Sequence, residues 1–194
     1  MSARSRSAAG ALVLGVALAG CTADTAEDTA QPPAPDTPAL ALDACPEQPD
    51  RPVAGAETLP PVALDCPGGG TLDLGRAPGV PTVVNLWASW CTPCREELPL
   101  VQQLADAAGD RLSVVGVISR DGAPQAASFA ADAGATFPSA FDGDGELMAE
   151  LGLNGLPYTY LLDADGGIAY VQVGPVADLA EFEALVAEHL GVTL

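Results

Sequence analysis

The chain has 194 residues, which suits one domain of ordinary size plus additional segments. It carries 26 acidic side chains against 7 basic ones, all of them Arg, for a formal net charge of −19. A surface this acidic repels nucleic acid, and no basic patch interrupts it, so we expect no nucleic-acid partner. Apolar residues make up 48% and aromatic residues 5%, so a packed core is feasible and must consist mostly of Ala, Val and Leu.

Residues 1–20 have the plan of an export signal. Two arginines precede an uncharged apolar run over residues 8–19, which is shorter than the ~20 residues needed to span a bilayer. The run ends in Leu-Ala-Gly before Cys21, which resembles a bacterial lipoprotein signal. That resemblance implies cleavage before Cys21 and a lipid on its thiol. The alternative is an ordinary signal peptide cut nearby, with Cys21 left as a free thiol.

Residues 21–52 consist mostly of Ala, Thr, Pro, Asp and Glu, without helical or strand periodicity. Such a segment cannot bury enough apolar surface to offset its conformational entropy. We therefore expect a disordered or extended tether over residues 21–52, in which Cys45 marks where order begins, followed by a folded domain over residues 53–194.

The domain shows apolar runs separated by turn residues and by helical patterns. In chain order we expect a strand over 71–74, a buried strand over 81–87, a helix over 93–108, a strand over 112–118, a helix over 123–133, a short helix over 145–151, strands over 158–162 and 168–173, and a last helix from its cap Asp178 to about residue 190. This order predicts an α/β fold, in which parallel winding leads into an antiparallel hairpin. The result is a mixed central sheet with helices on both faces.

The chemistry is expected at Cys91-Thr92-Pro93-Cys94, where a buried strand is followed by a helix. Cysteines at this spacing can close a small disulfide ring. Cys91 lies at the helix start, where unpaired N–H groups and the helix dipole favour a thiolate, and Cys94 lies one turn further in and is more shielded. The outer thiolate attacks a substrate disulfide and the inner one resolves the mixed disulfide. Pro93 is tolerated in the first turn of a helix.

Other uses of a C-x-x-C motif fit this chain less well. A four-cysteine zinc site would need Cys45 and Cys66, which form no second closely spaced pair. A haem attachment site needs His after the second cysteine, and Arg95 stands there. We therefore predict a redox-active disulfide, with no metal and no other cofactor.

These residues resemble the thioredoxin fold, and more closely its TlpA/ResA/DsbE-like branch. The match runs over residues 83–99 and extends to Gly155-Leu156-Pro157, which is similar to the family's cis-proline loop. The resemblance covers about residues 60–190 and implies a membrane-tethered thioredoxin-like domain. A cis Pro157 would bring the backbone of Leu156 beside the reactive cysteine, where a substrate strand can pair with it.

The resemblance also assigns roles to the residues around the motif. Trp90, next to the nucleophile, is expected to shield the site and contact substrate together with Thr92 and Pro93. Ordinary thioredoxin has a buried Asp where this chain has Asn85, which cannot accept a proton. The branch has instead a Glu three residues after the second cysteine, here Glu97, on the same helical face as Cys94. Its carboxylate would disfavour a thiolate and could move a proton. The alternative is a solvated helix charge.

Cys45 and Cys66 remain after the other cysteines are assigned. An exported protein meets oxidising conditions, so we expect them to form a structural disulfide that pins the N-terminal segment to the domain. The competing interpretation is a second redox pair that relays electrons to Cys91 and Cys94.

The predicted function is that of a thiol–disulfide oxidoreductase on the outer side of the cytoplasmic membrane. By resemblance it would reduce disulfides of exported proteins such as apocytochrome c, with electrons from a membrane thiol donor. We expect it to be a monomer. The same residues would serve an oxidase that inserts disulfides, since dithiol exchange is reversible. A copper-binding module is a non-enzymatic alternative, but such relatives use a C-x-x-x-C spacing and a loop His, whereas the lone His189 lies in the last helix. A peroxidase pocket is not recognisable.

Overall fold

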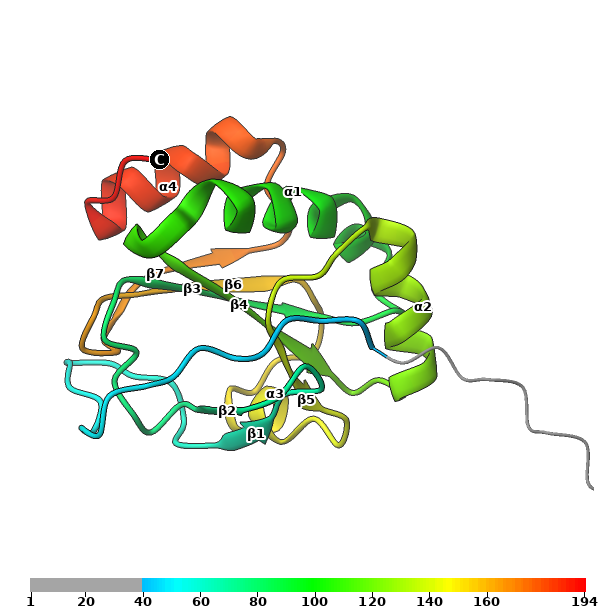
Figure 1. Cartoon of the computed structure of the whole chain (residues 1–194), viewed down its shortest axis with the longest axis horizontal. Helices are drawn as coiled ribbons and strands as arrows, with labels where there is room; N and C mark the ends of the chain where they lie inside the picture. Colours follow the sequence, from blue (N-terminus) through cyan, green and yellow to red (C-terminus); the bar gives the residue numbers. More distant parts are fainter. Residues whose placement is uncertain (1–39) are drawn as a thin grey trace, which may run out of the picture. The chain divides into compact units, whose positions relative to one another are not determined.

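The computed structural model describes residues 40–194 (Figure 1). The predicted export signal over residues 1–20, the lipidation at Cys21 and residues 21–39 of the predicted tether lie outside the described residues.

A five-stranded mixed sheet in the order β5-β4-β3-β6-β7 forms the centre of the fold. The central strand β3 (Thr82–Trp87) pairs in parallel with β4 (Ser113–Ser119), which pairs in parallel with β5 (Ser139–Asp142). On its other side β3 pairs antiparallel with β6 (Tyr158–Leu162), which forms a hairpin with β7 (Ile168–Val173). The predicted α/β fold with a mixed central sheet is confirmed.

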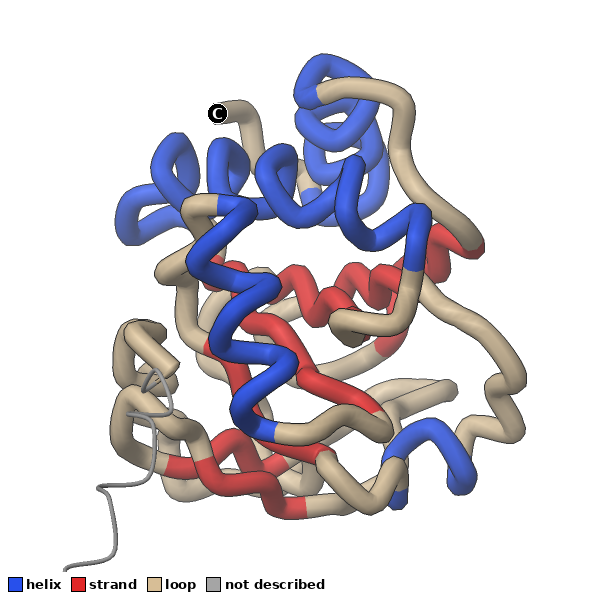
Figure 2. The backbone as a smooth tube through the Cα atoms, turned by 90° about the vertical axis from the view of Figure 1, so that its right-hand side faces the viewer, coloured by secondary structure: helices blue, strands red, loops and turns tan. Residues whose placement is uncertain are grey.

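The two faces of the sheet are covered differently (Figures 1 and 2). One face packs against α1 (Thr92–Ala108), α2 (Ala123–Ala133) and α4 (Leu179–Leu190), whose buried residues share one apolar cluster. The other face packs against the short α3 (Glu146–Glu150) and a two-stranded sheet. That small sheet consists of β1 (Ala63–Asp65) and β2 (Thr71–Asp73).

All six residues of β3 are buried because both of its faces are covered. Side chains of a strand alternate between the faces, so Val83, Asn85 and Trp87 face α1, whereas Val84 and Leu86 belong to the opposite cluster. This alternation places the amide of Asn85 under the helix that carries the two motif cysteines.

Two strands were not predicted from the sequence. The edge strand β5 has four residues, Ser-Ala-Phe-Asp, none of which is β-branched, so its sequence carries little strand propensity. Strand β1 buries only the middle one of its three residues. Both strands exist because a neighbouring strand supplies their hydrogen bonds, and this pairing is not visible in a local pattern.

The ordered part of the chain also begins before residue 53, the predicted start of the domain. Leu42 and Cys45 are buried, and the backbone N–H of Asp43 donates to the carbonyl of Thr136 at 2.7 Å. Residues 40–52 are therefore packed against the domain, whereas a free tether would make no such contacts. The polar composition of the segment as a whole concealed the few apolar side chains that dock it. Within residues 40–194, no helix has both the length and the apolar character needed to cross a bilayer.

Candidate active site

The motif cysteines lie where β3 ends and α1 begins. Cys91 is the N-cap residue of α1, and its sulfur accepts a hydrogen bond from the backbone N–H of Cys94 at 3.2 Å. The two residues form a disulfide with a Cα–Cα distance of 5.3 Å. Both side chains are buried, with 3% and 1% exposed, so Cys91 is shielded almost as fully as Cys94 in this disulfide form. The position at the helix start is the one that favours a thiolate at Cys91 after reduction.

The loop that leads into Cys91 is tied to the loop after β4. The carboxylate of Asp121 accepts hydrogen bonds from the backbone N–H of Ser89 at 2.6 Å and from its hydroxyl at 2.8 Å. The indole N–H of Trp90 donates to the carbonyl of Arg120 at 2.8 Å. Sequence reasoning missed Arg120 and Asp121, because only the parallel pairing of β3 and β4 brings their following loops together.

The two tryptophans near the motif have different environments. Trp87 is fully buried and stacks on Phe129 of α2, with ring centroids 5.8 Å apart. Trp90 is 50% exposed although its N–H is hydrogen-bonded, so its ring is fixed at the surface beside Cys91. Thr92 is exposed and Pro93 is half-buried.

The peptide bond between Leu156 and Pro157 is cis, as expected from the sequence. Pro157 is buried, and its carbonyl accepts a hydrogen bond from the backbone N–H of Gly174 at 3.1 Å. Leu156 is half-buried and packs against the apolar cluster that contains both motif cysteines. The structure therefore brings the predicted cis-proline loop and the motif to the same part of the core.

Glu97 lies beneath the site and is not a solvated helix charge, since only 1% of it is exposed. One carboxylate oxygen accepts from the side-chain amide of Asn85 at 2.9 Å and the other from the backbone N–H of Val176 at 3.2 Å. The amide of Asn85 also donates to the hydroxyl oxygen of Thr159 at 2.8 Å. Burial raises the pKa of Glu97, and the two hydrogen bonds oppose that shift. A buried carboxyl with a raised pKa is suited to holding a proton near Cys94.

The other predicted disulfide, between Cys45 and Cys66, is also present, with a Cα–Cα distance of 6.0 Å. It joins the N-terminal segment to the turn between β1 and β2. The backbone N–H of Cys45 donates to the carbonyl of Gly69 at 2.9 Å. A Cβ on Gly68 would lie 2.1 Å from the carbonyl oxygen of Leu42, so only glycine lets the two segments approach this closely. Neither cysteine lies in a described helix.

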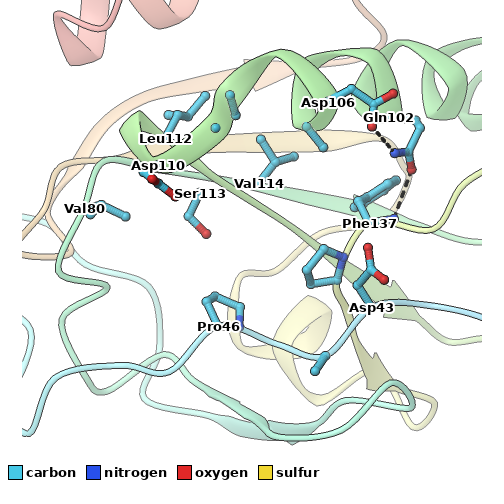
Figure 3. Close-up of a pocket in the computed structure, with 15 residues that line it drawn as sticks. Asp43, Pro46, Val80, Gln102, Asp106, Asp110, Leu112, Ser113, Val114 and Phe137 are labelled. Atoms are coloured by element: carbon cyan, nitrogen blue, oxygen red, sulfur yellow. Dashed lines mark hydrogen bonds between the residues drawn. The ribbon is translucent and has the colours of Figure 1, made fainter.

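A cavity lies near the C-terminal end of α1, the end opposite Cys91 (Figure 3), and has a volume of about 410 Å³. Its wall includes Asp43, Asp106 and Asp110 but none of the predicted site residues. The side chain of Gln102 crosses this region, donating to Asp106 at 2.7 Å and accepting from the backbone N–H of Thr136 at 2.7 Å. Within the described residues, no three His, Cys, Asp or Glu side chains gather closely enough to hold a metal ion.

A parallel strand–helix–strand unit, a disulfide at the first turn of its helix and a cis-proline loop packed on the same core define a thioredoxin-fold protein with a redox-type disulfide. The family model described as Redoxin matches residues 54–186, and the chain belongs to this family. The resemblance predicted from the sequence is thus confirmed.

Two related proteins, both thiol:disulfide interchange proteins, agree with this assignment. The chain is 37% identical over 106 residues to the thiol:disulfide interchange protein CycY of Rhizobium leguminosarum bv. viciae, covering 54% of this chain and 56% of CycY. It is 41% identical over 97 residues to the thiol:disulfide interchange protein DsbE of Escherichia coli K12, covering 50% and 51%. The chain therefore spans about half the length of these relatives.

A solved structure assigned as a thiol:disulfide interchange protein DsbE, from Chlorobium tepidum, is similar in fold. Its TM-score is 0.59 at 30% identity, and the match covers 69% of this chain and 93% of that protein. The similarity includes most of the domain that carries the motif.

Proposed function

We propose that this chain is a thiol–disulfide oxidoreductase that acts through Cys91 and Cys94. The observation that carries the proposal is the disulfide between these residues at the N-terminus of α1 in a member of the Redoxin family. Support also comes from the names of the relatives, which are thiol:disulfide interchange proteins.

In the reducing direction, the thiolate of Cys91 attacks one sulfur of a substrate disulfide. A mixed disulfide forms, and the other substrate sulfur leaves as a thiolate that takes up a proton. Cys94 then loses its proton and attacks the sulfur of Cys91, which releases the second substrate thiol and restores the Cys91–Cys94 disulfide. Two electrons pass from the dithiol to the substrate, and a membrane dithiol donor would return them.

The residues around the two cysteines would have separate roles in proton transfer and in substrate binding. Glu97 would take the proton of Cys94 when that residue attacks, which its buried position and raised pKa favour. The exposed ring of Trp90, with Thr92 and Pro93, would contact the substrate on one side of the disulfide. The backbone of Leu156 before cis Pro157 would pair with an extended substrate segment on the other side.

The substrate class proposed is disulfides of exported proteins, such as apocytochrome c before haem attachment, and the location is the outer face of the cytoplasmic membrane with a lipid on Cys21. A Cys21→Ser variant should then appear in the soluble fraction, while the unchanged chain stays with membranes. Membrane retention of the variant would rule out the lipid anchor.

The direction of electron flow is tested by the reduction potential of the Cys91–Cys94 pair, measured in defined glutathione or dithiothreitol buffers. A value near thioredoxin's, about −270 mV, supports the reductase, whereas a value near about −120 mV supports a disulfide-forming oxidase. Absence of any exchange between this pair and a model peptide disulfide would overturn the proposed function altogether.

A further inference from the structure

The arginines of this acidic chain are mostly engaged with other groups. Arg51 is paired with Asp165, Arg76 with Asp50, and Arg111 donates to the backbone carbonyls of Thr193 and Ala107. The guanidinium of Arg95 lies over the ring of Phe129, 4.7 Å from its centroid. Among the described residues, Arg120 is the one arginine whose guanidinium has no such partner.

Arg120 occupies the loop that holds the active-site segment. Its carbonyl accepts from the indole of Trp90 at 2.8 Å, and its N–H donates to the carbonyl of Asp142 at 2.9 Å. Its φ of +52° is the only positive φ of a non-glycine residue among the described residues. Such a conformation costs energy for a residue with a Cβ, is uncommon, and is one of the strained conformations that cluster at active sites and ligand clamps. The backbone of Arg120 is therefore held by a direct hydrogen bond to Trp90, the residue before Cys91.

The side chain of Arg120 lies against Gly145, in the turn between β5 and α3. A Cβ on Gly145 would lie 2.2 Å from Cγ of Arg120 and 2.6 Å from its Nε. The glycine thus leaves the space through which the arginine stem passes. The contact with Gly145 orients the exposed guanidinium of Arg120 before a substrate binds, which reduces the conformational entropy lost on binding.

The acidic groups near Arg120 do not neutralise it. The carboxylate of Asp121 is engaged with Ser89 and with the N–H of Gly122 at 2.9 Å. Asp142 is buried and accepts from the N–H of Glu146 at 2.7 Å. Asp144 and Glu146, on either side of Gly145, form no ion pair with Arg120 within 4 Å in the described part of the chain. The guanidinium donors therefore remain available to an external carboxylate.

We propose that Arg120 is a specificity-determining residue that binds a carboxylate of the substrate polypeptide where the substrate extends past Trp90 toward the turn between β5 and α3. This inference rests on the proposed function, since it names the substrate feature that the Cys91–Cys94 site selects. The preferred substrates are disulfide-bearing segments with Asp or Glu several residues away from the reacting cysteine, in the part that passes Trp90. The overall negative charge repels such segments, so the local cation decides which of them can dock.

The test uses two synthetic peptides, each closed by one disulfide, that differ only in Glu or Gln residues several residues away from the reacting cysteine. Their reduction by the full chain is followed as kcat/KM. Arg120→Gln should lower kcat/KM for the Glu peptide about two- to fivefold, as expected for an exposed charge pair, and leave the Gln peptide unchanged. The effect should vanish at about 1 M salt, where the Debye length is about 3 Å.

Two further variants separate position from charge. Arg111→Gln removes the same charge near the opposite end of α1 and should change neither peptide's rate. Gly145→Ala keeps every charge but displaces the arginine stem, and should lower the Glu-to-Gln rate ratio. Because each ratio is measured within one variant, a general loss of folded enzyme cancels.

An unchanged Glu-to-Gln ratio in Arg120→Gln, or an equal fall in Arg111→Gln, would overturn the inference while the Gln peptide still reports an active enzyme. No reduction of either peptide by the unchanged chain would instead reject the proposed function.

Discussion

The two disulfides of this domain have similar Cα–Cα separations, 5.3 and 6.0 Å, and are both buried, yet their surroundings differ. Cys91–Cys94 spans 3 positions at the start of α1, beside a buried carboxyl and an exposed tryptophan. Cys45–Cys66 spans 21 positions and joins two segments outside the helices, held by backbone hydrogen bonds and by a close approach at Gly68.

Both disulfides are buried and both bonds are formed, so neither property can be what would make Cys91–Cys94 the reactive one. A helix N-terminus stabilises the thiolate that exchange requires, and a nearby carboxyl provides for the proton. The Cys45–Cys66 bridge lies at no helix N-terminus, and the carboxyl of Asp65 beside it is exposed. Its long loop instead restricts the unfolded chain. We therefore expect activity and stability to depend on different disulfides.

The largest expected effect is on activity. Replacing Cys91 with Ala should reduce peptide-disulfide exchange to the uncatalysed background, because the attacking thiolate is lost. The paired variant Cys45→Ala with Cys66→Ala should retain nearly the activity of the unchanged chain at a temperature where it is folded. Loss of exchange in this paired variant would show that the second bridge relays electrons.

The second effect is on stability. In the chain-entropy model, removing the Cys45–Cys66 bridge costs about 3 kcal/mol, which corresponds to a fall in Tm of about 6–12 °C for a domain of this size. Urea unfolding under non-reducing conditions measures the change. The matched control is Cys91→Ala with Cys94→Ala, which opens a much shorter loop and should cost less. A larger loss in the control would reverse the assignment of roles.

The surroundings of Cys91–Cys94 could be predicted from the sequence better than the contacts that hold distant segments together. The run from Val83 to Pro99 combines a buried strand, a helix start and the motif, so local pattern sufficed there. The docking of Leu42 and the pairing of β5 depend on contacts between distant segments, as does the bond between Trp90 and Arg120. Such contacts follow from how the sheet aligns its loops, which no local pattern contains.

A third prediction concerns the carboxyl that distinguishes the active disulfide. Burial raises the pKa of Glu97 above 4.5, so the folded protein holds this proton more tightly than the unfolded chain. The contribution of Glu97 to stability is therefore greatest at low pH and is lost as pH rises from about 4.5 through the raised pKa. Glu97→Gln cannot titrate and should lack this loss.

Urea unfolding midpoints of the unchanged chain and of Glu97→Gln, measured from pH 4 to pH 8, test this sign. The variant should gain relative stability as pH rises, and the exchange rate should lose the corresponding step in its pH profile. Glu96→Gln, an exposed neighbour on the same helix, is the control. Parallel stability curves for the unchanged chain and Glu97→Gln would contradict a buried titrating carboxyl.

The smallest expected effect concerns the hydrogen bonds that orient Asn85 toward the carboxyl of Glu97. Thr159 lies directly opposite Asn85 in the pairing of β3 with β6, and its hydroxyl oxygen accepts one of the two amide hydrogens of Asn85. The other amide hydrogen is donated to Glu97, and Oδ1 of Asn85 has no hydrogen-bond partner among the described residues. Asn85 thus depends on Thr159 and Glu97 for its orientation. Thr159→Val keeps the shape but removes the acceptor, so it should cost about 1 kcal/mol of stability.

Thr159→Val should also alter the pH step assigned to Glu97, because a less firmly held Asn85 donates a weaker hydrogen bond to that carboxylate. The weaker bond lowers the pKa of Glu97 less, so the step should move to higher pH. Thr159→Ser retains the hydroxyl and should leave the step at its original pH, although the loss of a buried methyl group costs some stability. If the step moves equally in the Val and Ser variants, packing around residue 159 and not the hydroxyl sets its position, and the polar network contributes nothing specific to the Cys91–Cys94 disulfide.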